Sequence, residues 1–166
     1  MKSFALLVLS LILSSCAIAQ TRGNSVPEEL VGKWYKGTTS SLEYLNNSTG
    51  IANAAGGNGT GLEIKADGSF TKAQMAKVGL YGCSTVVFSY QTGKVGAAGD
   101  SLAFDIRKFY VSYKDSCNPR TNSEKNAAPT KHEYQFELGT DDSGRTTLCI
   151  NDGKEEECYW KEGEEE

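Results

Sequence analysis

The stretch KHEYQFEL, residues 131–138, decides the fold class. Its residues alternate strictly, so that His132, Tyr134, Phe136 and Leu138 fall on one face and charged or amide side chains fall on the other. A period of two is typical of a β-strand with one buried face, whereas an amphipathic helix repeats every 3.6 residues. We therefore predict a strand here, with His132 buried beside its aromatic neighbours and satisfied by a hydrogen bond.

The rest of the chain carries the same kind of signal. Short alternating segments follow one another from residue 30 onward, and Gly and Asp residues typical of turns separate them. A turn is expected at Gly93, and a change of alternation phase near Arg107-Lys108 predicts a β-bulge. Only the segment 71–78 is ambiguous between helix and strand. About eight antiparallel strands predict an all-β domain, either a closed barrel or a β-sandwich.

A tripeptide on the first expected strand bears on this choice. Gly32-Lys33-Trp34 resembles the G-x-W signature of the lipocalin-like, or calycin, group. The resemblance implies an eight-stranded lipocalin-like barrel in which Gly32 and Trp34 are structural. Trp34 would pack across the closed end under a basic side chain from a late strand, either Lys161 or Arg145. Without that relationship, Trp34 would anchor the core of another barrel or sandwich.

Four cysteines lie in the expected domain, namely Cys83, Cys117, Cys149 and Cys158. An even number in an exported chain predicts disulfides. A hairpin that turns just after Asp152 would place Cys149 opposite Cys158 with both side chains on one face. We therefore predict Cys149–Cys158 and, by elimination, Cys83–Cys117. The chain has no C-x-x-C motif and a single His, so we predict neither a metal site nor a cofactor.

The first 19 residues are typical of an export signal, because a basic residue and a short apolar run precede two overlapping cleavage patterns. Leu13-Ser14-Ser15-Cys16 resembles the bacterial lipobox, which implies cleavage before Cys16 and lipidation of that residue. Cleavage after Ala19 would instead release a free secreted or periplasmic protein. The expected order is a signal peptide at 1–19, a polar tether at 20–29, one β-barrel domain at 30–161 and an acidic tail at 162–166.

The net charge of the chain argues against two classes of partner, nucleic acid and anionic membranes. The chain carries 17 basic and 21 acidic residues, and removal of Lys2 with the signal leaves 16 against 21, a net charge of −5. A mildly acidic surface does not favour nucleic acid or anionic lipid. We expect membrane contact only through the lipid anchor of a bacterial lipoprotein.

The expected function is non-catalytic binding of a small apolar molecule. An eight-stranded barrel has room for one small ligand, and five aromatic side chains are candidates to line its cavity: Phe88, Tyr90, Phe104, Tyr134 and Phe136. The same rings could instead fill the core.

We find no catalytic constellation, and we therefore predict that the protein is not an enzyme. Asp141 and Asp142 lie in a turn sequence where Asp caps backbone groups, and no nucleophile elbow or phosphate loop is present. The alternative function is a protein-interaction module, such as an inhibitor or adhesion domain. Its contacts would come from the loops expected at 45–61 and 116–130.

Overall fold

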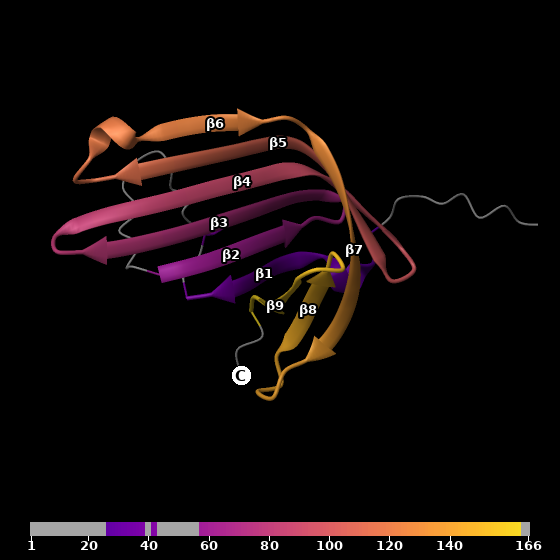
Figure 1. Cartoon of the computed structure of the whole chain (residues 1–166). Coiled ribbons are helices and arrows are strands. Elements are labelled where there is room, and N and C mark those ends of the chain that lie inside the picture. The colour runs from indigo at the N-terminus through magenta and orange to yellow at the C-terminus, as the bar shows by residue number, and fades with distance from the viewer. Residues whose placement is uncertain (1–25, 39–40, 43–56, 164–166) are drawn as a thin grey trace, which may run out of the picture.

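The computed structural model describes residues 26–38, 41–42 and 57–163 (Figure 1). The export signal, both cleavage sites and Cys16 lie outside these residues, as does most of the loop expected at 45–61. The described chain forms nine strands and two 3₁₀ helices, in the order η1 (Glu28–Leu30), β1 (Gly32–Gly37), β2 (Gly57–Ile64), β3 (Ser69–Leu80), β4 (Cys83–Ala98), β5 (Ser101–Asp115), η2 (Pro119–Thr121), β6 (Ser123–Ala127), β7 (Thr130–Thr140), β8 (Thr146–Asn151) and β9 (Glu156–Lys161).

Eight of the nine strands close into an antiparallel barrel. Each strand pairs with the next in the order β1, β2, β3, β4, β5, β7, β8, β9, and β9 pairs with β1 again. The prediction of an all-β barrel is confirmed, and the sandwich alternative is excluded. Closure gives these strands neighbours on both sides, which removes the free edges of an open sheet.

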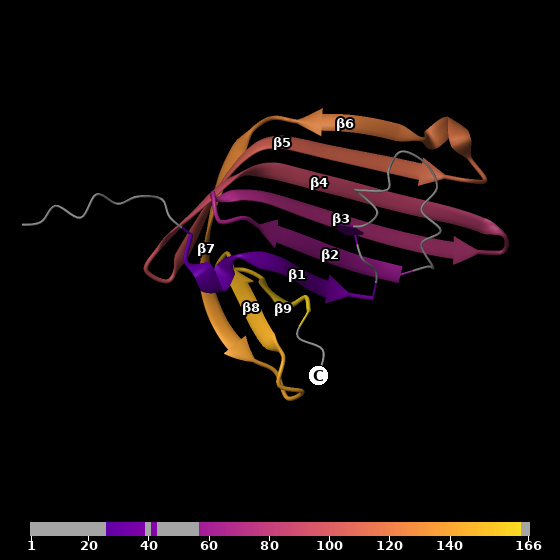
Figure 2. The same cartoon turned by 180° about the vertical axis from the view of Figure 1, so that it is seen from behind.

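The ninth strand extends the sheet beyond the barrel. Residues 101–106 of β5 pair with β7, whereas residues 109–113 pair with β6. The long strands β3, β4 and β5 therefore run past the short strands β8 and β9, and β6 continues the curved sheet on the far side of β5 (Figures 1 and 2). The segment 71–78 lies within β3, where pairing with β2 and β4 on both sides outweighs its weak helix propensity.

The predicted bulge is confirmed, but the turn expected at Gly93 is wrong. Thr92 faces Lys108 and Gly93 faces Ile106, so Arg107 is the extra residue. Strand β4 continues without a break from Cys83 to Ala98. A β-carbon at position 93 would collide with the backbone carbonyl of Asp105, so glycine here permits a close approach of two strands at the bulge.

The barrel interior is an apolar core at the end that carries Trp34, which we call the closed end. Its buried members are Val26, Leu30, Trp34, Leu62, Ile64, Phe70, Val95, Leu102, Phe104, Ile106, Leu148, Ile150 and Tyr159. A second, smaller cluster of buried side chains comprises Leu42, Ala73, Met75 and Phe88. It lies on the outer face of β3 and β4, because Ala73 and Met75 alternate with the inward-facing Phe70 and Lys72. Ser41 joins this cluster by donating a hydrogen bond to the carbonyl of Ala73 at 2.7 Å.

The closed end is plugged by η1. Trp34 Nε1 donates to the carbonyl of Leu30 at 3.0 Å, and Lys161 Nζ lies 5.3 Å from the centroid of the Trp34 ring. The basic side chain expected above Trp34 is therefore Lys161, whereas Arg145 lies over the ring of Trp160. Val26 is also buried, so the last part of the segment expected to be a tether packs onto the barrel.

Both predicted disulfides are confirmed. Cys149–Cys158 links two directly paired residues of β8 and β9, whose Cα atoms are 4.0 Å apart. Cys83–Cys117 fastens the start of β4 to the loop that follows β5, with 5.4 Å between the Cα atoms. Two disulfides indicate an oxidising, extracytoplasmic location.

Candidate binding site

The five aromatic residues expected to line one cavity lie on two different faces of the sheet. Phe104, Tyr134 and Phe136 belong to the interior core, and the rings of Phe104 and Tyr134 meet edge to face at 5.6 Å. Phe88 is buried in the outer cluster, and Tyr90 packs against it. The prediction that Phe88 and Tyr90 line the barrel cavity with the other three rings is therefore wrong.

The physical reason is the position of the bulge. It lies in β5 and leaves β4 in a single phase from end to end. Because Val95 faces the interior, the alternate residues Val87 and Ser89 also face inward, and Phe88 and Tyr90 must face outward.

The interior between two of the other rings, Phe104 and Tyr134, is closely packed. A void of only about 10 Å³ remains there, bounded by Lys72, Gln91, Phe104, Ile106, Tyr134 and Ile150. One water molecule needs roughly 10–15 Å³, so this void is too small for a ligand. Phe104 and Tyr134 therefore do not line a ligand-sized cavity at this point of the core, although Phe104 also reaches the groove beside the β4–β5 hairpin described below.

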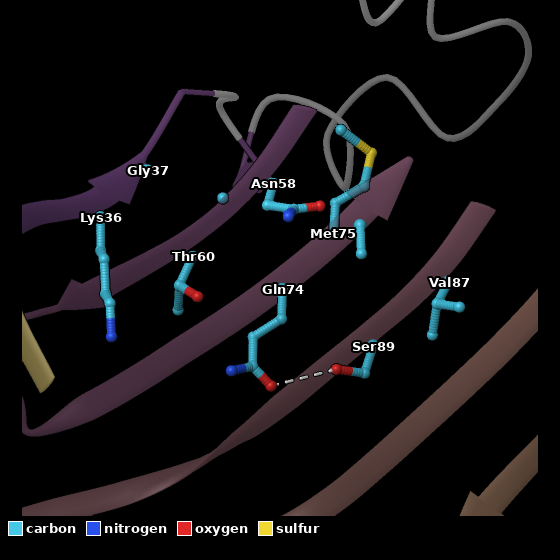
Figure 3. A pocket seen from close by; sticks show the side chains of 10 residues that line it. Lys36, Gly37, Asn58, Thr60, Gln74, Met75, Val87 and Ser89 are labelled. Atoms are coloured by element: carbon cyan, nitrogen blue, oxygen red, sulfur yellow. Dashed lines mark hydrogen bonds between the residues drawn. The ribbon is translucent and has the colours of Figure 1, made fainter. Parts of the chain in front are cut away.

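A larger pocket opens at the other end of the barrel, where β1 ends and β2 begins, which we call the open end. Its volume is about 330 Å³. It is lined by Lys36, Gly37, Asn58, Gly59, Thr60, Gln74, Met75, Ala76, Val87 and Ser89, all from β1 to β4 (Figure 3).

Four polar side chains form one row across this pocket. Lys36 pairs with Thr60, Thr60 with Gln74, and Gln74 with Ser89, so each residue is directly opposite the next on adjacent strands. We call these four residues the polar row. The row faces the interior because Lys36 is two residues from Trp34, and alternate side chains share a face.

A second row, nearer the open end, is more apolar. Asn58 pairs with Ala76, and Ala76 pairs with Val87, whose side chain is exposed. The pocket thus has a polar wall toward the barrel core and an apolar wall toward the tips of β3 and β4. Such an arrangement suits a molecule with one polar end and an apolar body.

The orientation of Gln74 is set by its neighbour. Ser89 Oγ donates to Gln74 Oε1 at 3.4 Å, which turns the amide nitrogen away from Ser89. In Figure 3 the side chains of Lys36, Thr60 and Gln74 extend from their strands on the same side of the sheet. The polar row therefore offers an ammonium group, a hydroxyl and an amide N–H as donors.

A charged network lies between the polar row and the apolar core. Lys72 Nζ is 2.7 Å from Glu157 Oε2, and Tyr159 Oη donates to the same oxygen at 2.7 Å. Lys36 Nζ lies 3.8 Å from Glu157 Oε1. Two ammonium groups thus share one carboxylate, which leaves one positive charge at the base of the pocket uncompensated among the described residues.

The same contacts fix the ionisation of the network. Burial alone would raise the pKa of Glu157, but the hydrogen bond and charge of Lys72, with help from Tyr159 and Lys36, bring the pKa below its ordinary value. Burial, together with the charge of Glu157, raises the pKa of Tyr159. At neutral pH, Glu157 is therefore a carboxylate and Tyr159 a neutral phenol.

A second groove of about 660 Å³ lies beside the β4–β5 hairpin. Its charges are largely paired with one another, because Lys94 is 3.3 Å from Asp67 and Arg107 is 3.6 Å from Asp105. The described residues that line this groove therefore carry no unbalanced charge comparable to that at the open end.

His132 lines this second groove and is exposed, so its predicted burial is wrong. It shares the face of Tyr134 as expected, and the two rings are 6.2 Å apart. Its burial fails because β8 pairs with β7 only from Gln135 onward. No neighbouring strand covers residues 130–134 on that side of β7 in the described chain.

Other residues with chemical potential have structural roles. Asp141 accepts hydrogen bonds from Ser143 and Arg145, which hold the pKa of its carboxyl far below the usual range, as expected of a turn-capping Asp. No three His, Cys, Asp or Glu side chains gather into a potential metal site within the described residues. The described helices are too short to cross a membrane.

The polar row and the network below it were not singled out from the sequence. A signal was present, because counting by two from Trp34 reaches Lys36, and counting by two from Phe70 reaches Lys72 and Gln74. Charged residues on the buried face of a strand mark a place where the interior opens or ions pair. The relevant partner of Lys72, Glu157, lies 85 residues away in sequence, and periodicity alone does not identify it.

No protein-family model matches the chain, and comparisons with curated proteins and with solved structures also gave no match.

Proposed function

We propose that this protein is an exported, lipocalin-like carrier that binds one small molecule at the open end of its barrel and does not convert it chemically. The observation that carries the proposal is the 330 Å³ pocket whose polar and apolar rows meet on one concave face. A disulfide-stapled barrel suits this role, because a rigid frame holds pocket side chains in place before the ligand arrives.

The ligand that fits this pocket is amphipathic. The apolar cavity expected from the sequence would have needed several hundred Å³ among the core aromatics, and the void beside Phe104 and Tyr134 is only about 10 Å³. An apolar portion can rest on Ala76 and Val87, while a polar group meets Lys36, Thr60 and Gln74. We therefore propose an amphipathic ligand with one polar end, in place of the wholly apolar ligand that the sequence predicted.

The lipocalin-like assignment is supported by the closed end. The Trp34 ring lies under Lys161 and is hydrogen-bonded to η1, as the resemblance of Gly32-Lys33-Trp34 implies. The described chain also enters the barrel at this end. If Cys16 is lipidated, the tether would therefore join the barrel beside its closed end.

Native mass spectrometry of the protein purified from its own host tests the binding proposal. We expect a non-covalent small-molecule adduct on the wild type. Ala76→Trp should remove it, because the indole would occupy the pocket. Glu63→Trp, on the outer face of β2, should retain it. A wild-type protein that carries no adduct and binds no amphipathic probe would overturn the proposal.

The same spectra report on the anchor. Cleavage before Cys16 with acylation adds the mass of a lipid to an N-terminal cysteine, whereas cleavage after Ala19 leaves an unmodified chain that begins at Gln20. Either result leaves the pocket proposal unaffected, because the barrel begins beyond both cleavage sites.

A second candidate function, capture of another envelope protein, is favoured by one observation. Tyr81 and Val78, at the tip of the β3–β4 hairpin, are 96% and 64% exposed, and Cys83–Cys117 fixes this tip to the loop after β5. A photo-cross-linking residue at position 81 should then give one discrete protein adduct in the host. The same residue at Asp142, in the turn between β7 and β8, should give none. Equal labelling at both positions would exclude this function.

A further inference from the structure

We propose that the polar row is a subsite for an oxyanion, such as the carboxylate or sulfonate of an amphipathic ligand, with Lys36 as its ionic partner and Thr60 and Gln74 as hydrogen-bond donors. This inference rests on the proposed binding function and assigns the chemistry of the ligand's polar end. It follows from the charge balance, the donor geometry and the composition of the pocket lining.

The charge balance leaves Lys36 available. Glu157 is held by Lys72 at 2.7 Å and lies 3.8 Å from Lys36, so most of the carboxylate's interaction is with Lys72. The Lys36 side chain is 43% exposed and reaches into the pocket (Figure 3). An anion that enters the pocket would give the Lys36 ammonium group a close negative partner.

The donors converge because of the strand register. Lys36, Thr60 and Gln74 are consecutive members of one row, and directly opposite residues on adjacent strands have Cβ atoms roughly 4.5–5.5 Å apart. Their ammonium, hydroxyl and amide groups can thus contact the oxygens of one carboxylate or sulfonate. Ser89 fixes the orientation of the Gln74 amide, because its hydroxyl donates to Gln74 Oε1. The NH₂ group of Gln74 then remains to donate to the ligand.

The composition of the lining disfavours a cation. Among the ten lining residues Lys36 is the one with a charge, and no carboxylate lies among them. Glu157 is below the row and is already shared by two ammonium groups. A cationic ligand would meet a net positive charge, whereas an anionic ligand would neutralise it.

Two fluorescent probes separate the polar end from the apolar body. 1-Anilinonaphthalene-8-sulfonate carries a sulfonate, and N-phenyl-1-naphthylamine is the same ring system without it. Each is titrated against the wild type, Lys36→Gln, Gln74→Leu, the blocked-pocket variant Ala76→Trp and the matched control Lys33→Gln. Lys33 lies on the same strand with 46% exposure and its own ion pair to Glu162, but it faces outward.

We expect the sulfonate probe to bind the wild type about tenfold more tightly than the neutral probe. Lys36→Gln should remove most of that advantage and change neutral-probe affinity by less than about twofold. Gln74→Leu should act in the same direction with a smaller effect, and Lys33→Gln should change neither affinity. Thermal melts of all five proteins establish that each variant is folded.

The outcomes are distinct. Equal affinity for the two probes, with both excluded by Ala76→Trp, would overturn the oxyanion subsite and leave the carrier function standing. A sulfonate preference that survives both Lys36→Gln and Gln74→Leu would also overturn it, because the anion would then be held elsewhere. Failure of both probes to bind would count against the carrier function itself. Displacement of only the sulfonate probe by sodium sulfate would support an anion site that also accepts free inorganic anions.

Discussion

Lys161 and Trp34 are paired residues of β9 and β1, and the Lys161 ammonium lies over the indole ring, 5.3 Å from its centroid. The same Nζ donates to the carbonyl of Glu29 at 3.2 Å, so one side chain joins a strand, a ring and the η1 plug. Gly32 leaves space for it, because a β-carbon there would lie 3.2 Å from Lys161 Cε. The G-x-W sequence thus describes a packing unit that closes the barrel.

Replacing Lys161 tests that unit. We expect Lys161→Met to lower the free energy of unfolding by about 1–2 kcal/mol, because it removes a partly desolvated cation–π contact and leaves the Glu29 carbonyl without this donor. Urea titration followed by tryptophan fluorescence measures the change. Lys161→Arg, which keeps a cation over the ring, should lose less than half as much. Equal stability of Lys161→Met and the wild type would show that the contact contributes nothing.

Gly93→Ala tests the close strand approach at the bulge. A β-carbon at this position would collide with the carbonyl of Asp105, so the strands must separate, and we expect a loss of about 1–3 kcal/mol in unfolding free energy. Gly79→Ala is the control. It lies on the neighbouring strand β3, and its β-carbon would have only an ordinary contact at 3.6 Å. If both substitutions had the same effect, the loss would reflect strand propensity rather than the bulge.

Local patterns in the sequence predicted the strands of an all-β domain, the bulge and one disulfide, whereas the barrel was implied by the G-x-W resemblance and Cys83–Cys117 was inferred by elimination. Alternation identified the strands, a turn signal after Asp152 placed Cys149 opposite Cys158, and the phase change placed the bulge near Arg107-Lys108, where Arg107 is the extra residue. These features depend on residues near one another in the chain. For the same reason, local patterns were sufficient to infer them.

Features that depend on distant strands were not predictable in this way. The burial of a residue such as His132 depends on whether a neighbouring strand extends far enough to cover it, and β8 ends too early. The outward direction of Phe88 depends on which of two paired strands carries the bulge. The pocket likewise required β1 and β3 to place Lys36 and Gln74 in one row, a register that no local pattern fixes.

The two disulfides should contribute unequally. Their sequence separations are 34 residues for Cys83–Cys117 and 9 for Cys149–Cys158. In the chain-entropy view the longer loop contributes about 4 kcal/mol and the shorter about 3 kcal/mol. We therefore expect Cys83→Ala/Cys117→Ala to be less stable than Cys149→Ala/Cys158→Ala in chemical denaturation. The reverse order would show that native-state packing, rather than loop length, dominates.

Glu157 should make the stability of the protein depend on pH. Its pKa is lower in the folded protein than the ordinary value, so the unfolded chain binds the proton first as the pH falls. The stabilisation by Glu157 is therefore complete above the ordinary pKa and is lost as the pH falls through the lowered one. Glu157→Gln should abolish this contribution. At neutral pH it should cost about 1–3 kcal/mol, less than a fully buried broken ion pair, because Lys72 loses its partner but keeps some contact with water.

The measurement compares unfolding free energies of the wild type, Glu157→Gln and the exposed-neighbour control Glu156→Gln from about pH 7 down to about pH 3. Other acidic groups, such as Asp67, also have lowered pKa values, and they destabilise all three proteins equally in acid. The difference between the wild type and Glu157→Gln should therefore shrink below about pH 4.5, whereas the difference between the wild type and Glu156→Gln should stay near zero. A gap that remained constant down to pH 3 would mean that the Lys72–Glu157 contact does not lower the carboxyl's pKa and that the network holds less charge than the geometry indicates.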